Sequence, residues 1–512
     1  MAELSTVGID LGTTFSSLAI VNNHGEPEII PNAETERLTP SAVFLDNQSI
    51  IVGQIAKDAS LASPDKVVLF IKRQMGNPNW SFKYQNRTLK PEDISAMILT
   101  KLKKDAESRL NRKLPYAVIT VPAYFDDARR RATIAAGEIA GFRVLDILNE
   151  PTAAAIAFGV ERSQRKETVM VYDLGGGTFD VTIMRIEEDN FRVIASDGDY
   201  QLGGKDFDDA LMRFAVEKFT KEHGFDLTTD PIIAGELRIH AEKAKRELSK
   251  LEKTTMILRA RDKTSRIEIT RNQYESLIKP KLDTTLSMVR SALKDAHLDS
   301  RQIDRILLIG GSTRTPAVKR ILRTFFEKEP DASVNPDEAV ALGAALIAAK
   351  KIVDVAPNTV AAPIVEKVGE LEITEVTSHS LGIEAVVPGT QQRINTIIIP
   401  RQRPIPTEES KEFITTTPGA TSIAVKIYQG EFQDPALCNL IGEFRLSGLP
   451  PNRPAGKKVR VTVSYAPNGV IHVTALDIET GQETTTQVSY KIGPSTEEKS
   501  AKQMWLDSLQ VQ

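Results

Sequence analysis

The sequence contains very little cysteine and no surplus of charge of either sign. Cys438 is the single cysteine among 512 residues, which excludes an internal disulfide and zinc sites built from several cysteines. The 65 Lys and Arg residues nearly balance the 68 Asp and Glu residues, so the formal net charge is only −3. A general basic field that would attract nucleic acid is absent, and we therefore expect no nucleic-acid partner.

Long hydrophobic runs are also missing. The longest one, Ala339–Ala349, is well below the ~20 residues that a membrane-spanning helix requires. The first residues, Met1–Asp10, include Glu3 and lack the basic start of a secretory signal. We therefore expect a cytoplasmic protein that has no membrane partner.

The chain changes character near residue 370. Before Lys351, short apolar runs such as Tyr116–Val121 alternate with long helical patterns, which predicts α/β layers. After Glu372, apolar and polar residues alternate over short stretches such as Ser422–Tyr428, which is typical of strands. The Asn468-Gly469 pair lies between two such stretches and predicts a hairpin turn. The sequence thus indicates a large α/β part followed by an all-β part.

Two segments of the α/β part share one pattern. Val7–Phe15 and Val171–Asp180 each contain a β-rich run, then Asp-Leu-Gly, then small residues and threonine before a second β-rich run. Each is predicted to be a hairpin whose glycines let backbone N–H groups approach a polyphosphate closely. Asp10 and Asp173, at the ends of the first runs, could hold Mg²⁺ through its water molecules. The repetition favours a phosphate site over two ordinary glycine-rich hairpins.

A third glycine segment, Ile309–Arg314, follows a predicted strand and leads into a predicted helix. It could admit a base or ribose against the backbone, with Arg314 stacking on the base. Taken alone, such a segment is more often a tight strand-to-helix turn. The chain has neither a GxxxxGK[ST] loop nor a strand-GxGxxG-helix fingerprint, so the two repeated hairpins belong to neither of these phosphate motifs.

These three segments, in this order, resemble the two phosphate motifs and the adenosine motif of the actin-like ATPase superfamily. Other stretches narrow the resemblance to the 70-kilodalton heat-shock protein (DnaK-type) chaperones, over about residues 5–494. The stretches that carry it are Gly8–Ser16, Ile119–Phe125, Asn149–Ile156, Asp173–Asp180, Leu202–Phe207, Asn335–Val340, Leu381–Glu384 and Tyr428–Glu431.

The resemblance implies a fold class of α/β plus all-β. An actin-like, two-lobed ATPase domain would span residues 1–368, and a linker would span 369–376. A peptide-binding β-sandwich would span 377–494, and residues 495–512 would form a short helix that is the remnant of the family's helical lid.

The resemblance also implies roles for polar residues near the phosphates. Lys72 matches the lysine that contacts the γ-phosphate and the attacking water, and Glu150 matches the carboxylate that positions this water. Thr178 would reach the γ-phosphate. Asp10 and Asp173 would hold hydrated Mg²⁺, while Asp10 and Asp180 match positions that coordinate K⁺. Without the family context, Lys72 would be read as a solvated lysine and Glu150 as an acid at a helix start.

Further residues would contact ATP or ADP. The small residues of the glycine motifs that match nucleotide positions are Gly12, Thr13, Thr14, Gly175, Gly176, Gly177, Gly203 and Gly204. Those that match the adenosine side are Glu242, Lys245, Arg246, Ser249, Gly310, Gly311, Ser312, Arg314 and Asp337. The four from Glu242 to Ser249 have the spacing of one helical face, which would otherwise indicate a solvated charged surface.

Apolar residues of the β part match positions near the peptide cleft of the family: Ile383, Val386, Phe413, Ile423, Val425 and Ile427. An extended peptide could bind there through its backbone, with apolar side chains in pockets. Alternating apolar residues of a sandwich are core residues by default, so some of the six are expected to be core.

The linker departs from the family pattern of an acid followed by four apolar residues. In Glu370–Glu375, Glu372 and Thr374 replace two of the apolar positions. Because each lost side-chain burial is worth roughly 1–3 kcal/mol, we expect weaker docking of the linker on the ATPase domain.

Three other departures concern partners and peptide release. Ser378 and His379 stand where the family has Pro and Leu. Asp146 replaces an arginine that contributes to coupling with J-domain proteins, which puts an ordinary J-domain co-chaperone in doubt. Most of the lid is missing from this sequence, so we expect peptide to dissociate faster than from proteins with a lid.

The resemblance predicts an ATP-dependent chaperone with a role in the stress response. As an ATPase it would use Mg²⁺ and K⁺ and gate the binding of extended hydrophobic segments of unfolded proteins, and a nucleotide-exchange factor is a further implied partner. The alternative is a nucleotide-binding scaffold or exchange factor of the same family with weak or uncoupled ATPase, favoured by the linker and Asp146. A sugar kinase of the same superfamily should lack the β-sandwich.

Overall fold

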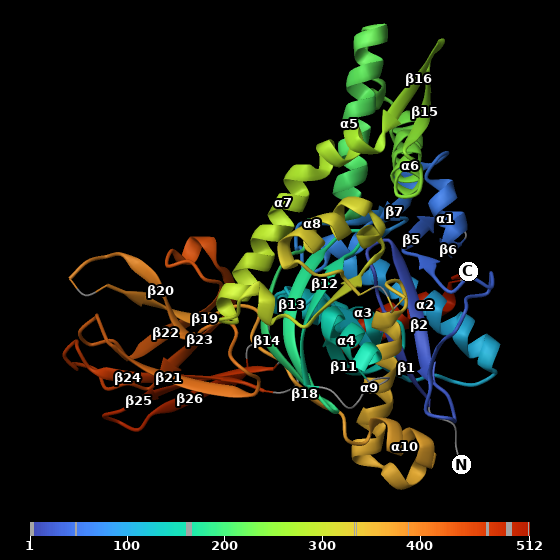
Figure 1. Ribbon diagram of the computed structural model, residues 1–512. Helices are drawn as coiled ribbons and strands as arrows, with labels where there is room; N and C mark the ends of the chain where they lie inside the picture. Colours follow the sequence, from blue (N-terminus) through green and yellow to red (C-terminus); the bar gives the residue numbers. More distant parts are fainter. Residues whose placement is uncertain are drawn as a thin grey trace.

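The computed structural model describes residues 5–46, 49–159, 166–331, 333, 335–387, 389–466, 470–487, 494–509 and 511–512. Figure 1 shows a large α/β part and, at its side, a smaller part built from strands. The change of character near residue 370 in the sequence corresponds to the passage from one part to the other.

The first sheet of the α/β part has the order β11-β10-β1-β2-β3, with β4 beside β2. Its strands are β1 (Thr6–Asp10), β2 (Phe15–Val21), β3 (Pro27–Ile29), β4 (Thr39–Pro40), β10 (Tyr116–Val121) and β11 (Arg143–Asn149). Helices α2 (Pro91–Leu110) and α3 (Asp127–Ile139) pack on it. A small sheet, β6 (Ile50–Val52), β5 (Ala42–Leu45) and β7 (Val67–Leu69), carries α1 (Gln54–Ala59). The hairpin β8 (Phe82–Tyr84) and β9 (Arg87–Leu89) lies before α2.

The second sheet has the order β17-β12-β13-β14-β18. Its strands are β12 (Lys166–Leu174), β13 (Phe179–Glu187), β14 (Asn190–Asp199), β17 (Arg305–Ile309) and β18 (Glu372–Thr374). Helices α5 (Gly204–His223), α6 (Pro231–Leu248), α7 (Arg271–Asp295) and α8 (Pro316–Phe326) accompany it, with the hairpin β15 (Lys253–Ala260) and β16 (Lys263–Thr270).

Helices α4 (Glu150–Gly159) and α9 (Ala339–Val355) join the two sheets, because their side chains share one core with residues of both. They approach so closely that a Cβ on Gly343 would lie 1.8 Å from the Ala153 carbonyl oxygen. Only glycine fits such a contact. Helix α10 (Ala362–Val368) follows α9 and packs beside it.

The β part consists of two four-stranded antiparallel sheets around one hydrophobic core. The first contains β19 (Leu381–Val386), β20 (Arg393–Ile399), β22 (Ser422–Gln429) and β23 (Asn439–Ser447). The second contains β21 (Thr407–Ile414), β24 (Lys458–Tyr465), β25 (Ile471–Asp477) and β26 (Glu483–Gln487). Strands β24 and β25 pair antiparallel up to Tyr465 and Ile471, while the Asn468-Gly469 pair predicted to turn between them lies outside the described residues.

The linker forms strand β18, which extends the second sheet. Ile373 pairs with Phe191 of β14, and Leu371 is fully buried in the α/β core. Glu372 is exposed and accepts a hydrogen bond from Asn190 (3.1 Å). Since successive side chains of a strand alternate in direction, the two retained apolar residues make the buried contact. The expectation of weaker docking assumed that Glu372 and Thr374 replace buried apolar side chains. Glu372 is exposed and Thr374 is partly buried, so the loss at position 372 is small.

Helix α11 (Thr496–Ser508), predicted as a lid remnant, lies on the α/β part and not over the β-sandwich. Leu506 is buried among residues of the first sheet and its helices, and Val511 pairs with Ile50 at the edge of β6. Lys502 forms an ion pair with Asp93 at the start of α2 (2.7 Å). The β-sandwich is therefore connected to the α/β part at both of its ends.

Candidate functional site

A cleft of about 1510 Å³ opens between the helices of the two sheets. It is larger than a typical small-molecule pocket of ~300–1000 Å³, so a whole nucleotide fits. All nucleotide residues named from the sequence line it except Gly177, Gly203 and Gly204, and of the proposed cation residues only Asp180 does not. Gly177, Gly203, Gly204 and Asp180 do not line the cleft themselves, but each contacts a residue that lines it or its direct neighbour.

The two repeated hairpins face each other at the bottom of the cleft. In each, the aspartate is the last or nearly the last residue of the first strand, and Asp173 pairs with Asp180 across the second hairpin. A Cβ on Gly176 would lie 2.4 Å from Thr14 Oγ1, and one on Gly177 would lie 2.3 Å from Thr13 Cγ2. The glycines therefore let the two turns touch, which brings their backbone N–H groups into one small volume.

Lys72 and Glu150 form a buried ion pair in this cleft. Lys72 is 3% exposed and Glu150 is 6% exposed. Lys72 lies in a single turn of 3-10 helix, Ile71–Gln74, directly after Phe70, whose φ of 58° is left-handed. Glu150 begins α4 after β11. Although burial opposes it, the carboxylates of Glu150 and Asp10 hold the pKa of Lys72 above its ordinary value, so the ammonium stays charged.

Three buried carboxylates surround this ion pair. Burial and the nearby charge of Glu150 raise the pKa of Asp10 to about 7 and that of Asp180 to about 7, and raise that of Asp173 well above its ordinary value. Asp180 Oδ2 is buried without a hydrogen-bond partner among the described residues. Several carboxylates facing one lysine favour a bound cation, because only added positive charge allows all of them to ionise.

The carboxylates do not form a direct metal cage. Within the described residues, no group of three His, Cys, Asp or Glu side chains lies close enough to ligate one ion. The donor set therefore fits a cation such as Mg²⁺ that keeps several of its own water molecules.

The turn Leu202–Gly204 buttresses the second hairpin. Gly204 N donates to the Gly175 carbonyl (3.0 Å), Lys205 N donates to that of Gly176 (2.8 Å), and a Cβ on Gly203 would lie 2.6 Å from Gly177 N. Ser312, from the third glycine segment, donates to the Gly175 carbonyl as well (2.8 Å). Gly203, Gly204 and Ser312 thus support the turn of the second hairpin from the side away from Thr13 and Thr14.

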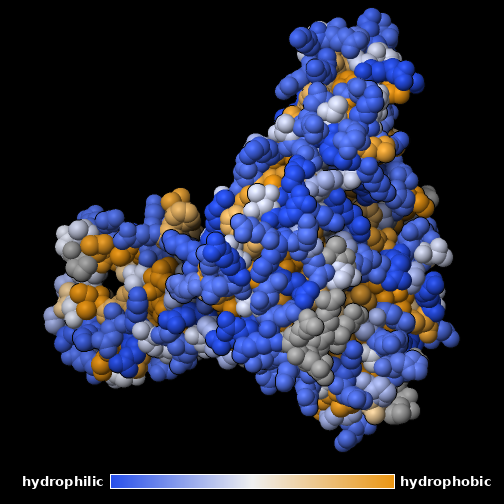
Figure 2. Space-filling model, in the orientation of Figure 1, coloured by the Kyte–Doolittle hydropathy of each residue, from blue (hydrophilic) through white to orange (hydrophobic). Residues whose placement is uncertain are grey.

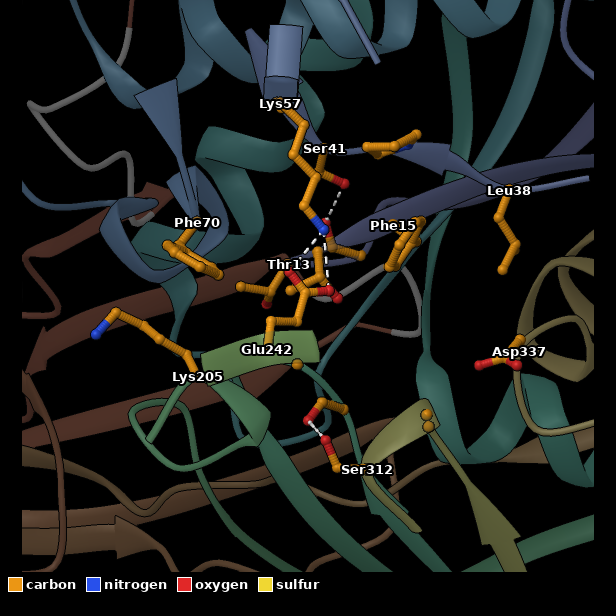
Figure 3. A pocket seen from close by; sticks show the side chains of 18 of the residues that line it. Thr13, Phe15, Leu38, Ser41, Lys57, Phe70, Lys205, Glu242, Ser312 and Asp337 are labelled. Atoms are coloured by element: carbon orange, nitrogen blue, oxygen red, sulfur yellow. Dashed lines mark hydrogen bonds and ion pairs between the residues drawn. The ribbon is translucent and has the colours of Figure 1, made fainter. Parts of the chain in front are cut away.

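The cleft wall that the sequence predicts to contact adenosine is built on α6 and the turn after β17. Glu242 of α6 forms an ion pair with Lys57 of α1 (2.7 Å), and Figure 3 shows the two side chains pointing toward each other across the opening. Arg246 pairs with Glu242 (2.8 Å), and Lys245 pairs with Asp208 (2.9 Å). Ser249 Oγ donates to the carbonyl of Lys245 in its own helix (3.1 Å).

The third glycine segment completes this wall. Gly310 has a φ of 80°, and a Cβ there would lie 2.5 Å from the Leu174 carbonyl oxygen, so the position requires glycine. Gly311 and Ser312 follow in a 3-10 turn, and Arg314 pairs with Asp337 (2.5 Å) at the open side of the cleft. An exposed guanidinium held in this way offers a flat surface on which a base can stack.

Sequence reasoning missed three residues of the site: Lys57, which lines the cleft, and Arg73 and Asp206, which hold the second hairpin from outside it. Arg73 Nε donates to the Gly177 carbonyl (2.7 Å) and its guanidinium contacts Asp206, which also accepts from Gly203 N (2.8 Å). The one available signal for Arg73 was its place beside Lys72. Lys57 belongs to a short helix between weak patterns, and nothing in its spacing indicated that it crosses the cleft.

The six apolar residues named for peptide binding divide into two groups. Ile383, Val425 and Ile427 are buried in the sandwich core, where Ile383 and Ile427 are neighbours on β19 and β22. Val386, Phe413 and Ile423 are only partly buried. Figure 2 shows a hollow in the β part with hydrophobic residues beside it. The second group is therefore the one that can offer apolar surface to a ligand.

Asp146, which replaces a family arginine, is paired inside the chain. Its carboxylate forms an ion pair with Lys351 of α9 and accepts a hydrogen bond from Ile147 N (2.9 Å). Three residues further on, Asn149 donates to Glu375, the residue that follows β18 (2.8 Å). Burial raises the pKa of Glu375. A residue of the linker thus contacts the residue that precedes Glu150.

The site and fold can now be set beside known proteins. A model of the Hsp70 protein family matches residues 6–511. The chain belongs to the Hsp70 family. It is 42% identical to the chaperone protein DnaK of Thermotoga petrophila over an alignment of 485 residues. This alignment covers 93% of this chain and 79% of that protein. It is also 42% identical over 490 residues to the chaperone protein DnaK of Thermosipho melanesiensis, with 94% and 80% covered.

As a member of the Hsp70 family, the chain is an ATP-dependent molecular chaperone with ATPase activity, and it binds ATP and ADP. Within the described residues, no helix has both the length and the apolar content that crossing a bilayer requires.

Proposed function

We propose that ATP hydrolysis in the cleft of the α/β part gates the binding of extended apolar peptides to the β-sandwich. The buried pair of Lys72 and Glu150, placed among three carboxylates with raised pKa values, is the observation that carries the hydrolytic half. The partly buried Val386, Phe413 and Ile423 support the peptide half.

The cleft residues suit phosphoryl transfer to water. Phosphoryl transfer needs a positioned water and positive charge at the γ-phosphate more than covalent help from the protein. A γ-phosphate would draw the Lys72 ammonium away from Glu150, which would leave the Glu150 carboxylate free to accept a hydrogen bond from the attacking water. Thr13, Thr14 and Thr178 would donate hydroxyl hydrogens to phosphate oxygens.

Cations belong to the same proposal. Asp10 and Asp173 would hold hydrated Mg²⁺, which supplies positive charge to the phosphates, and Asp10 and Asp180 would hold K⁺. The unpartnered Oδ2 of Asp180 and the raised carboxylate pKa values fit both roles.

The proposal divides the chain as expected from the sequence: an ATPase domain over 1–368, a linker over 369–376, a peptide-binding sandwich over 377–494, and residues 495–512 as the remnant of a helical lid. Helix α10 ends at Val368, β18 lies in the linker, and the described sandwich strands run from Leu381 to Gln487, which supports these limits.

Single-turnover ATP hydrolysis tests the site. Lys72→Ala should slow hydrolysis by at least about 100-fold while nucleotide affinity changes little, since Lys72 acts on the transferred phosphoryl group. Lys166→Ala is the matched control, because Lys166 also pairs with a glutamate, Glu187 (2.8 Å), but on the surface. Equal turnover in the Lys72→Ala variant and the control would contradict the assignment. Hydrolysis without any response to peptide would instead favour a nucleotide-dependent scaffold or exchange factor.

A further inference from the structure

Two consecutive residues of the β part hold a loop of the ATPase part. Ser378 Oγ donates a hydrogen bond to the Ala123 carbonyl (2.6 Å), and His379 Nε2 contacts the Tyr124 carbonyl (3.1 Å). Ala123 and Tyr124 lie between β10 and α3. Because a carbonyl oxygen can only accept, Nε2 of His379 carries the hydrogen in this contact.

The peptide unit between Ala123 and Tyr124 is held from both sides. Its carbonyl accepts from Ser378 and also from Arg130 Nη2 (3.1 Å). Its N–H, which belongs to Tyr124, donates to Asp180 Oδ1 beside the cleft (3.0 Å). The peptide unit is planar and rigid, so the direction of the carbonyl fixes the direction of the N–H. A donor on the carbonyl also polarises the unit and strengthens the N–H as a donor.

His379 holds the next peptide unit, between Tyr124 and Phe125, through its hydrogen bond to the Tyr124 carbonyl. Its ring packs edge-on against the Tyr124 ring, with centroids 4.4 Å apart, and its Nδ1 lies 3.8 Å from Glu431 Oε1 of the β part. Glu431 in turn accepts from Ser380 N (3.1 Å). With both flanking carbonyls held, the backbone at Tyr124 cannot rotate freely while the β part is docked.

Asp180 has little room to move in response. It is 1% exposed, and a Cβ on Gly198 would lie 2.8 Å from Asp180 Oδ1 and 3.1 Å from Tyr124 Cβ. Oδ1 is occupied by the Tyr124 N–H, whereas Oδ2 has no partner among the described residues. The orientation of this carboxylate, and hence the direction of Oδ2, therefore depends on the 123–124 peptide unit.

We propose that Ser378, with His379, is a positioning residue that couples docking of the β-sandwich to the orientation of Asp180 beside the ATPase cleft. The inference rests on the proposed function, because it assigns Asp180 to cation binding in hydrolysis. Proline and leucine stand at these two positions in the family pattern, and proline has no hydroxyl that could donate to the Ala123 carbonyl. The contacts of Ser378 and His379 with the 123–124 loop therefore depend on residues that differ from the family pattern.

The test uses the full chain with Ser378→Ala and two readouts. Hydrogen exchange measured by mass spectrometry should show faster exchange of the Tyr124 amide, within the segment Val121–Phe125. Single-turnover ATP hydrolysis should slow by about 3- to 10-fold, as expected for the loss of one hydrogen bond, with nucleotide affinity unchanged. Ser378→Thr keeps the hydroxyl and should restore both readouts.

A matched control and a double variant complete the test. Ser276→Ala removes a hydroxyl that donates to a backbone carbonyl in α7 (2.8 Å), and it should change neither readout. In Asp180→Asn, adding Ser378→Ala should slow hydrolysis no further, because both changes act through one carboxylate.

Unchanged exchange at Val121–Phe125 in Ser378→Ala would overturn the inference, and so would faster exchange with wild-type hydrolysis. If the wild-type chain showed no hydrolysis, the proposed function would fail instead, and the exchange measurement would still decide whether Ser378 holds the loop.

Discussion

The ATPase cleft and the β-sandwich place their candidate residues in opposite environments. In the cleft, the residues that matter are polar groups that are buried, such as Lys72 and Glu150. In the sandwich they are apolar groups, of which Ile383, Val425 and Ile427 are indistinguishable from core. A buried ionisable group is costly to fold, so its presence points to function. A buried isoleucine contributes to stability wherever it lies, so its burial says nothing about a ligand.

The largest expected effect on this comparison comes from Glu150→Gln. The amide keeps the shape of the side chain but loses the charge that pairs with Lys72 and that orients water in the proposed mechanism. Hydrolysis should fall by about 100- to 1000-fold, a loss of roughly 3–4 kcal/mol of transition-state stabilisation. The measurement is single-turnover hydrolysis at saturating ATP. Near wild-type rates would mean that burial of a charge does not identify the working residues of this cleft.

Ile427→Ala is the corresponding change in the sandwich. Ile427 is 1% exposed and pairs with Ile383, so its truncation should cost about 2–5 kcal/mol of folding stability in the β part. Ile423→Ala, in the same strand but partly buried, should cost less stability and weaken peptide binding more. Thermal unfolding and peptide titration, run on both variants, check this order. If Ile427→Ala weakened peptide binding more than Ile423→Ala did, the peptide would contact the buried group and not the partly buried one.

The pH dependence of stability should also separate the two regions. The folded-state pKa of Asp180 is raised to about 7, so the folded protein binds a proton more tightly than the unfolded chain does. The contribution of Asp180 to stability is therefore present near pH 4 and is lost as pH rises through about 7. In nucleotide- and metal-free protein, Asp180→Asn should gain stability relative to wild type between pH 5 and pH 7.5, by more than about 1 kcal/mol.

Urea unfolding at the two pH values measures this difference, with Ile427→Ala as the control. The destabilisation by Ile427→Ala should be the same at pH 5 and pH 7.5, since no charge is involved. A pH-independent effect of Asp180→Asn would contradict the account of the buried carboxylates.

The smallest expected effect concerns the linker. Glu372→Leu restores an apolar residue at an exposed position of β18, so docking should change by no more than about 0.5 kcal/mol. Leu371→Ala, at the buried position, should weaken docking by about 2 kcal/mol or more. Protease cleavage of the linker reports docking. Equal effects of the two changes would mean that β18 does not remain docked in solution.

The sequence predicted the cleft better than it predicted the sandwich, for a physical reason. Asp10 and Asp173 occur at strand ends beside glycine turns, a combination that few structures other than a phosphate site require. The six apolar residues named for peptide binding alternate with polar residues as in any sandwich strand. The sequence therefore could not tell which of them belong to the core and which face a ligand. Arg73 and Lys57 were missed because their partners, the Gly177 carbonyl and Glu242, are distant in the sequence.

Elements defined by docking were also beyond the sequence. The sequence predicted a short helix in residues 495–512 but did not indicate that Leu506 and Val511 would be buried against the α/β part. The linker strand shows the converse, since Glu372, one of its two polar substitutions, is exposed to solvent, where a polar side chain costs little. In both cases the surface of the α/β part on which the segment packs decides which of its residues are buried. A single sequence does not show which surface a segment will pack on.

The central claim is that ATP hydrolysis and peptide binding are coupled, and one measurement tests it most directly. Single-turnover ATP hydrolysis by the full chain is followed with and without a saturating extended apolar peptide. Coupling through β18 and the docked sandwich predicts that the peptide changes the hydrolysis rate several-fold. The same rate in both conditions, with peptide binding verified in the same samples, would contradict the account.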